Sequence, residues 1–411
     1  MHKTRTWVLA VLLVAAPLAL ADELTFEEAV ALALEHDDPS PARFEARARA
    51  FEHRAVAEAQ LPDPLITGQV ANLPVDSFDF GQEGMTQALR IGVRQEFPAG
   101  RTLALTGEQR ATQAEVERAR AAQARRDIAL EVRNAWLERV WHARAVGILQ
   151  HARDVIGAQI GSLSARFATG RMHAQDVLRA ELELALIDDR IIEHQGQIEV
   201  ARAALARYLG PAADRPVPHA LPTLAAPGQV EELQQRLLDH PAVIAAQGQI
   251  DAGNLDVAIA EQAYKPKFAL EAGYGVRTEL PNLASVGVTL SLPLFVDQRQ
   301  NRQRAAAVQQ LGAERLDRDL LLHELRRRLL ADHASYRRLD QRVALYTSLL
   351  RERAGQTAQA AITTYANNQT DFAELIRSQL AELDAEVEQA ELETRRAQMW
   401  ARLAWLTGEP S

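Results

Sequence analysis

Apolar residues in the second half of the chain recur at alternating steps of three and four positions. This spacing is typical of a heptad seam that packs one helix against others. Asp332 is its only polar member, and a looser stripe of the same kind runs from Val132 to Gly147. Core packing accounts for both stripes, so neither calls for a cofactor. The seam consists of Leu322, Leu325, Leu329, Asp332, Tyr336, Leu339, Val343, Tyr346 and Leu350.

Two long stretches of the chain lack proline, and both are rich in the helix formers Ala, Leu, Arg, Glu and Gln. Helices that filled them would each be about 100 Å long, at ~1.5 Å per residue. Shorter helical segments follow or precede each stretch. We therefore predict long helices over 101–166 and 298–364, and shorter ones over 42–61, 172–208, 242–264 and 371–407.

Other segments alternate apolar and polar residues, which predicts strands with one apolar face. They run from Gln87 to Phe97, over 268–276 and over 285–292, and a further strand is expected near 63–73. A length of ~9–11 residues matches a tilted transmembrane strand, with its apolar face toward lipid and its small or charged face toward a lumen. A soluble sheet on a core would show the same alternation.

Charged residues on the small and polar side of these strands are predicted to face the lumen. They would either set the electrostatics of a pore or be solvated residues without selectivity. These residues are Arg90, Arg94, Glu96, Glu271 and Arg277.

The two halves of the chain resemble each other. LARYLG over 205–210 aligns with LAWLTG over 403–408, and AQLP over 59–62 aligns with AYKP over 263–266. A unit of about 200 residues is therefore used twice. The predicted organisation is a signal peptide over 1–21, a first repeat over 22–210, a linker over 211–227 and a second repeat over 228–411. Each repeat would hold a β-hairpin, at about 63–97 and 267–294, and a helical hairpin that turns near 167–171 or 365–369.

Composition and charge narrow the function classes. The 411 residues carry a net charge of −9, which argues against nucleic acid because a binder needs a concentrated basic face. The absence of cysteine excludes a disulfide scaffold, a cysteine nucleophile and a lipid anchor on cysteine. Lys3 and Arg5 precede an apolar run that ends at Ala19-Leu20-Ala21, the pattern of a secretory signal peptide. An uncleaved membrane anchor is the alternative.

Catalytic chemistry is not indicated. His323, Glu324 and His333 lack the spacing that puts two metal ligands on one helical face. His36-Asp37-Asp38 favours a helix cap or link over a metal site, and no Gly-x-Ser-x-Gly elbow is present. We therefore expect no enzyme activity, cofactor or bound metal.

The layout resembles the outer-membrane efflux proteins typified by TolC. The resemblance rests on the doubled plan, on hairpins set between LPDP (61–64) and FPAG (97–100) and between YKPK (264–267) and LPLF (292–295), and on two turns. The turns are RFATGRMHAQDVLRA (166–180) and TTYANNQTDFAELIRS (363–378). The opening LTFEEAVALALEH (24–36) and the Asn72-Leu73-Pro74 loop are most similar to the heavy-metal (cobalt-zinc-cadmium or copper-silver) branch.

The resemblance implies a mainly α fold with a small β part: a homotrimer with a 12-stranded barrel in the outer-membrane lipid of a Gram-negative cell. A long α-helical coiled-coil barrel would extend from it into the periplasm. The trimer would be the exit duct of a tripartite pump with a periplasmic adaptor (membrane fusion) protein and a proton-driven inner-membrane transporter. Alternatives are the outer component of type I protein secretion and, in a different class, a soluble periplasmic coiled-coil adaptor.

The resemblance also assigns residues at the helical turns. A periplasmic gate is expected at Asp176, Tyr365 and Glu374, although Thr370 and Arg377 depart from the family pattern. Three copies of Glu374 would form an acidic ring that favours cations; surface salt bridging is the alternative. The adaptor-contact tips are expected at Thr169, Gly170, Arg171, Asn367, Asn368 and Gln369, which could equally be turn residues alone.

Overall fold

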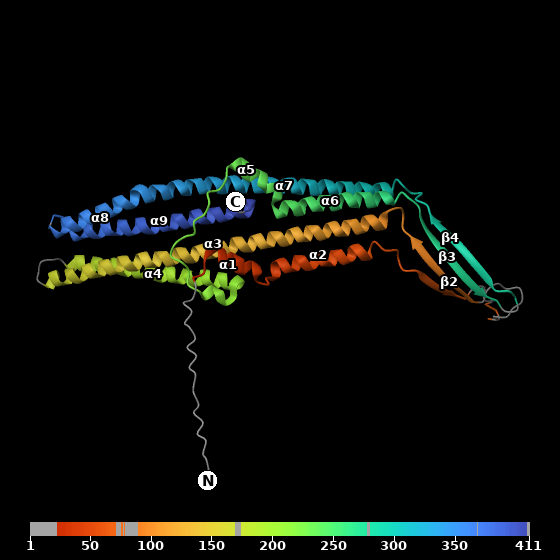
Figure 1. The fold of residues 1–411 in the computed structure, drawn as a ribbon, viewed down its shortest axis with the longest axis horizontal. Helices are drawn as coiled ribbons and strands as arrows, with labels where there is room; N and C mark the ends of the chain where they lie inside the picture. Colours follow the sequence, from red (N-terminus) through yellow and green to blue (C-terminus); the bar gives the residue numbers. More distant parts are fainter. Residues whose placement is uncertain are drawn as a thin grey trace, which may run out of the picture. The chain divides into compact units, whose positions relative to one another are not determined.

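The computed structural model describes residues 23–70, 75, 76, 78, 89–168, 174–277, 280–367 and 369–408. Over these residues the chain is mainly helical with one antiparallel sheet of four strands, which confirms the predicted fold class to that extent (Figure 1). The elements are α1 (Phe26–Glu35), α2 (Pro39–Ala57), β1 (Leu65–Gln69), β2 (Leu89–Phe97), α3 (Thr102–Ala168), α4 (Ala174–Leu209), η1 (Gly210–Asp214), α5 (Val230–Arg236), η2 (Leu237–Asp239), α6 (Pro241–Gln262), β3 (Lys267–Val276), β4 (Leu283–Ser291), α7 (Gln300–Leu345), η3 (Tyr346–Leu350), α8 (Arg351–Ala366) and α9 (Phe372–Thr407).

The sheet has the strand order β1-β2-β3-β4, and each neighbouring pair is antiparallel. The two predicted hairpins are β1–β2 and β3–β4, and pairing of β2 with β3 joins them into one sheet. Strand β1 is shorter than the expected 63–73. Each half of the chain thus contributes two strands to a shared structure.

The same order of elements occurs twice: two helices, two strands, then a long helical hairpin. Contacts divide the chain into two compact units that each combine parts of both halves. The first unit consists of three segments: the chain up to His36, Val132–Thr223 and Arg342–Arg395. The second holds Asp37–Glu131, Leu224–Gln341 and the chain from Arg396 onward. The repeat boundaries inferred from sequence remain a prediction.

Trp136 of α3 organises one end of the first unit. Its side chain is almost fully buried, its Nε1 donates to the carbonyl of Leu24 at 2.8 Å, and Phe26 packs edge-on against it at 5.3 Å. Arg139, also buried, donates to the carbonyls of Ala213 and Arg215 at 2.7 and 2.8 Å. Because buried carbonyls need partners, these bonds hold α1 and η1 against α3.

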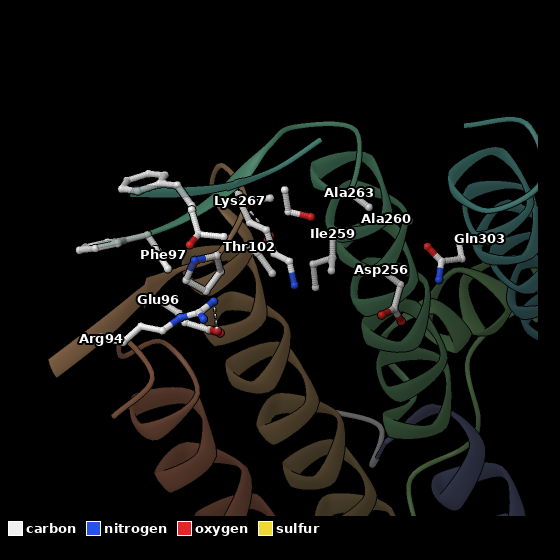
Figure 2. Close-up of a pocket in the computed structure, with 16 residues that line it drawn as sticks. Arg94, Glu96, Phe97, Thr102, Asp256, Ile259, Ala260, Ala263, Lys267 and Gln303 are labelled. Atoms are coloured by element: carbon white, nitrogen blue, oxygen red, sulfur yellow. Dashed lines mark hydrogen bonds and ion pairs between the residues drawn. The ribbon is translucent and has the colours of Figure 1, made fainter. Parts of the chain in front are cut away.

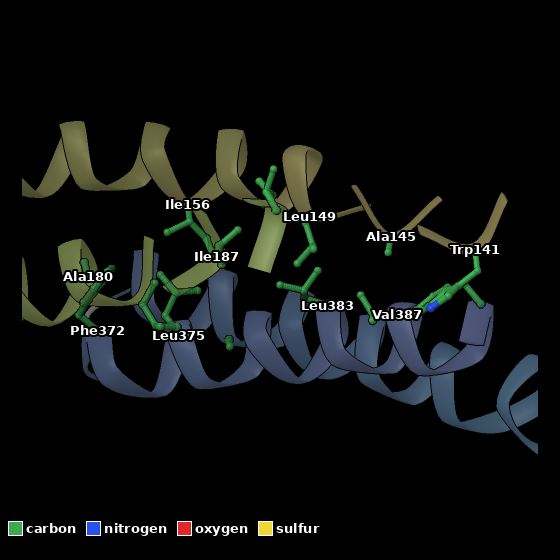
Figure 3. Close-up of a cluster of buried hydrophobic side chains, with 14 residues drawn as sticks. Trp141, Ala145, Leu149, Ile156, Ala180, Ile187, Phe372, Leu375, Leu383 and Val387 are labelled. Atoms are coloured by element: carbon green, nitrogen blue, oxygen red, sulfur yellow. The ribbon is translucent and has the colours of Figure 1, made fainter. Parts of the chain in front are cut away.

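A second apolar cluster of the first unit joins α3, α4, α8 and α9 (Figure 3). Leu149 of α3, Ile187 of α4 and Leu383 of α9 are buried in it. Figure 3 shows their side chains converging between the helices, which is the interdigitation that long parallel or antiparallel helices require. Tyr365 packs at the edge of this cluster.

The heptad seam forms the core of the second unit. Leu322, Leu325 and Leu329 are buried against α5, α6 and the end of α9. Asp332 is half-buried, and burial raises the pKa of its carboxyl. The predicted seam is therefore confirmed over this part of α7.

The seam prediction is wrong at its far end, where Leu350 is 37% exposed. Tyr346–Leu350 is a π-helical turn, which changes the number of residues per turn and rotates the faces of the helix beyond it. In α3 the looser stripe fails at Gly147, which is exposed, while Ala145 and Leu149 are buried. Positions seven residues apart rotate by ~20° around a straight helix. The residues that stay buried along such a helix therefore do not keep a strict seven-residue spacing.

Equivalent helices in the two halves begin with different caps. Asp38 accepts from the backbone N–H of Ser40 at 2.7 Å to cap α2, and His36 ends α1, which confirms the capping interpretation of this segment. In the second half, His240 caps α6: its Nδ1 accepts from the N–H of Ala242 at 3.2 Å. The imidazole is fully buried and packs edge-on against Trp405 at 4.9 Å.

The buried cap predicts a pH dependence of stability. Burial, with a smaller contribution from Arg126, lowers the pKa of His240 from 6.5 to about 4. Below pH 6.5 the unfolded chain therefore binds a proton that the folded chain does not, and stability falls between pH 6.5 and 4. At about 1.4 kcal/mol per pKa unit, the loss is about 3 kcal/mol.

Thermal unfolding of the wild type and of His240→Asn at pH 7.5 and 5 measures this loss. Asparagine keeps a cap acceptor but does not titrate, so the variant should lose less stability on acidification than the wild type. Equal losses in the two proteins would show that His240 does not titrate with the predicted shift.

Candidate functional site

The sheet has two chemically different faces. Register pairs Val93 with Ala272 and Ala272 with Val286, and side chains alternate between the faces along each strand. On the apolar face Phe97 stacks on Phe268 with ring centroids 4.8 Å apart. The apolar residues of this face are largely exposed: Ile66, Ile91, Val93, Phe268, Leu270, Tyr274, Val286, Val288 and Leu290.

Arg90 lies across the polar face of the sheet. Its Nη2 donates to Glu271 of β3 at 3.4 Å and to Ser285 of β4 at 3.1 Å, so one side chain connects three strands. Gly273 between them provides the space, because a Cβ there would lie 2.8 Å from the Ser285 hydroxyl and 2.9 Å from the Arg90 Nε. The small residues of this face therefore serve a packing role that alternation alone does not reveal.

The other charged residues expected on this face are arranged less uniformly. Arg94 pairs with Glu96 on the same strand at 3.4 Å. Arg277 follows β3, and its backbone N–H donates to the Asn282 side chain at 3.0 Å. The structure thus brings Arg90 and Glu271 together, and Arg94 and Glu96 together, and sets Arg277 apart at the end of the hairpin.

A cavity of about 560 Å³ opens where the polar face meets the helices (Figure 2). Arg94, Glu96 and Lys267 line it from the strands, and Asp256 and Ile259 line it from α6. Asp256 accepts from the side chain of Gln109 at 2.5 Å. This cavity could not be predicted from the sequence, because its lining comes from segments far apart in the chain and no local pattern marks them.

The α8–α9 turn contains the described residues of the predicted tip. Asn367 ends α8, with its N–H bonded to the Thr363 carbonyl at 3.2 Å, and the N–H of Gln369 donates to the Thr364 carbonyl at 2.8 Å. Asn368, Thr169, Gly170 and Arg171 lie outside the described residues. The two described tip residues therefore terminate a helix, as turn residues should, and their exposed side chains leave them open to a partner.

Tyr365, Asp176 and Glu374 occupy helix ends near the turns. Tyr365 is half-buried and packs edge-on against Phe372 at 5.9 Å. Asp176 and Glu374 lie in the first turns of α4 and α9, where the helix dipole favours a negative charge. Glu374 accepts from Arg377 at 2.5 Å.

The Glu374–Arg377 pair changes the expected acidic ring. Both side chains are well exposed, so the pair contributes little stability. Viewed from a distance, however, a carboxylate beside a guanidinium carries no net charge. A ring of three Glu374 residues would therefore attract cations much less than the sequence alone predicts.

Other polar groups of the described residues do not form an obvious cofactor or metal centre. No group of three or more His, Asp or Glu residues suited to a metal ion occurs within the described ranges. Sequence analysis missed a contact between His142 and His194, whose Nδ1 atoms are 2.7 Å apart and link α3 to α4. Among the described residues as a whole, no helix has the length and apolar content needed to cross a membrane.

Comparison with known proteins gives partial sequence matches and an almost complete structural match. No protein-family model matches the chain. It is 21% identical over 195 residues to the outer membrane efflux protein BepC of Brucella suis biovar 1 (strain 1330), a match that covers 46% of this chain and 43% of BepC. It is 26% identical over 187 residues to the cobalt-zinc-cadmium resistance protein CzcC of Cupriavidus metallidurans (strain CH34), covering 44% of each chain. Both matches span less than half of the relative.

The structural match extends over the whole fold. The crystal structure of the outer membrane protein VceC from Vibrio cholerae superposes with a TM-score of 0.78 at 18% identity, covering 95% of this chain and 97% of VceC. At that identity the likeness shows the fold, and the two sequence relatives show a similarity over less than half of the chain. BepC and VceC are both named as outer membrane proteins. The chain therefore has the fold of VceC, and part of its sequence is similar to the outer membrane efflux protein BepC and to CzcC.

Proposed function

We propose that this protein is the outer-membrane exit duct of a tripartite efflux pump. It would be passive, with no catalytic role, and the energy for transport would come from an inner-membrane transporter. The observation that carries the proposal is a four-stranded sheet that, over the described residues, has an exposed apolar face and two open edges. The efflux and resistance functions named for BepC and CzcC support the direction of transport.

The exposed apolar face favours contact with lipid. Val286, Ile66 and Val288 are 84%, 78% and 68% exposed, and all lie on the same face. Burial of each such side chain is worth about 1.5–3 kcal/mol. A contiguous apolar face on a sheet of this size is unfavourable in water, so another surface is expected to bury it. The acyl chains of a bilayer would bury the apolar side chains of all four strands.

The open edges favour a trimer. Among the described residues, β1 and β4 each pair on one side only, and unpaired backbone groups cannot face lipid. Four strands are fewer than the ~8 of the smallest transmembrane barrel. Three chains would supply twelve strands, and β4 of each chain would pair with β1 of the next.

The exposed apolar face also distinguishes the duct from one of the two alternative functions. A soluble periplasmic adaptor would bury the apolar face of its sheet in a core, and here that face is exposed. The outer component of type I protein secretion would share the fold, so genes beside this one distinguish it: an ABC transporter favours secretion and a proton-driven transporter favours efflux.

A more specific candidate cargo is a small solute such as a heavy-metal cation. The named function of CzcC, cobalt-zinc-cadmium resistance, favours this branch. The opening segment and the loop after β1 are similar to the same branch, although Asn72-Leu73-Pro74 lies outside the described residues.

The gate proposal assigns closure of the periplasmic entrance to Asp176 and Tyr365. Tyr365 is held by Phe372 at the edge of the buried cluster, so its hydroxyl is presented from a fixed ring. Asp176 lies on a first helical turn and is half-buried. A bond between these groups in the trimer would hold the entrance narrow until the adaptor binds.

Single-channel recording in planar bilayers tests the duct and its gate. Wild-type trimers should give a small conductance, and Asp176→Asn with Tyr365→Phe should raise it several-fold because the link is lost while the side-chain shapes are kept. Glu352→Gln is the matched control, since this α8 acid bonds within its own helix to Gln356 at 2.9 Å. A channel whose conductance is the same in all three proteins would remove the gate, and failure to form any channel would remove the duct.

The tip proposal assigns adaptor contact to the turns between the long helices. Thr169, Gly170, Arg171, Asn367, Asn368 and Gln369 would meet the helical hairpins of the adaptor. Because the chain has no cysteine, a single cysteine reports on a single position.

Asn367→Cys should therefore form an adaptor cross-link in cells with a short bifunctional thiol reagent. Thr357→Cys, an exposed α8 position away from the turn, should form none. Cross-linking at Thr357 but not at Asn367 would contradict the tip assignment.

A further inference from the structure

A small pocket beside the larger cavity has an unusual lining. It measures about 230 Å³ and lies in the second unit, where β3, β4, α6 and α7 meet. Three cationic side chains line it, Lys265, Lys267 and Arg299, and no Asp or Glu is among its lining residues. Three like charges around one space repel one another, so a pocket of this composition favours a negatively charged group.

Nearby acids are engaged elsewhere. Glu261 pairs with Arg304 at 2.9 Å, and Asp297 accepts from the Asn301 side chain at 3.0 Å. Over the described residues, neither Lys267 nor Arg299 has an ion-pair partner. Lys265 donates to Gln262 at 2.8 Å, which uses one of its three ammonium hydrogens. The pocket therefore keeps most of its positive charge and most of its donors.

Gln300 supplies a second and independent observation. This residue begins α7, lines the pocket and is 7% exposed, yet its Oε1 is buried without a hydrogen-bond partner in the described residues. A buried amide without a partner costs about 1–3 kcal/mol. The amide can turn to present its N–H₂ instead, and an oxygen-rich ligand would then satisfy it.

The pocket lies on the side of the sheet that faces away from its apolar surface. Lys267 pairs in register with Ser291, and both belong to the polar face with Glu271 and Gly287. Their side chains therefore lie on the opposite side of the sheet from the apolar face. A solute in water reaches this side more readily than a lipid headgroup would.

We propose that Lys265, Lys267, Arg299 and Gln300 form a binding site for a small oxyanion, such as a phosphate or carboxylate group carried by a soluble molecule. Arginine and lysine are the usual partners of such groups in proteins, and the Ser291 hydroxyl adds a donor. The site stands on this geometry alone and does not depend on the channel. If the protein is an export duct, the site favours anionic cargo, and a metal would pass this point more readily as an anionic or neutral complex than as a free cation.

Titration calorimetry with inorganic phosphate tests the site on the purified full-length protein in a nonionic detergent at low salt. The wild type should bind phosphate, and Lys267→Gln with Arg299→Gln should weaken binding at least tenfold. Arg302→Gln is the matched control, because Arg302 is an exposed α7 arginine outside the pocket. It should change the affinity less than twofold.

The folded state and the ligand source are checked in the same series. Thermal midpoints of both variants must match the wild type, and Lys265→Gln provides a second lining variant if the double variant unfolds. Absence of phosphate binding in the wild type, or equal weakening in Arg302→Gln, would overturn the proposal. In nanodiscs, phosphate affinity should be the same with phosphatidylcholine alone and with added phosphatidylglycerol. Loss of binding in the anionic discs would instead assign the pocket to a lipid headgroup.

Discussion

An incomplete sheet is the constraint on which the rest of this protein depends. Among the described residues, four antiparallel strands leave two edges without partners and one apolar face exposed. In water this arrangement invites aggregation, and in lipid the open edges are not tolerated. Under the proposed function, pairing with copies of the same chain would satisfy the backbone at the edges, and the bilayer would cover the apolar face.

The polar face explains how such a sheet keeps its register before closure. Arg90 reaches two neighbouring strands, and Gly273 leaves room for it. A one-residue slip would turn every side chain to the other face and would separate Arg90 from both partners. The same face continues into the basic pocket around Lys267, so the residues that fix the sheet lie next to those that would meet a passing solute.

Much of this fold could be predicted from sequence, because long helices and amphipathic strands have strong periodic signals. Residues such as Leu325 and Leu329 follow the heptad seam and are buried as expected. The seam prediction failed at Leu350, where a π-helical turn changes the period, and such a turn leaves no mark in apolar spacing. Pairing of β2 with β3 was also not deduced, since no sequence pattern specifies which hairpins are neighbours.

The candidate site was predictable only in part. Alternation placed Arg90 and Glu271 on the polar face, but it could not show that they pair, because register depends on the whole sheet. Arg377 was noted as a departure from the family pattern, yet its bond to Glu374 emerges only from side-chain geometry. The basic pocket was missed for a similar reason: Lys265, Lys267 and Arg299 come from three different segments.

Disulfide cross-linking across the two edge strands tests the central claim most directly. Within one chain, β1 and β4 are separated by two strands, or about 14 Å at ~4.8 Å per strand, whereas a disulfide needs Cα atoms within ~7 Å. Thr67→Cys combined in turn with Ser285→Cys, Gly287→Cys and Thr289→Cys therefore samples contacts between chains only. The account predicts that at least one pair, oxidised in membranes, gives covalent dimers and trimers on denaturing gels without reductant. Monomer alone for all three pairs would contradict it.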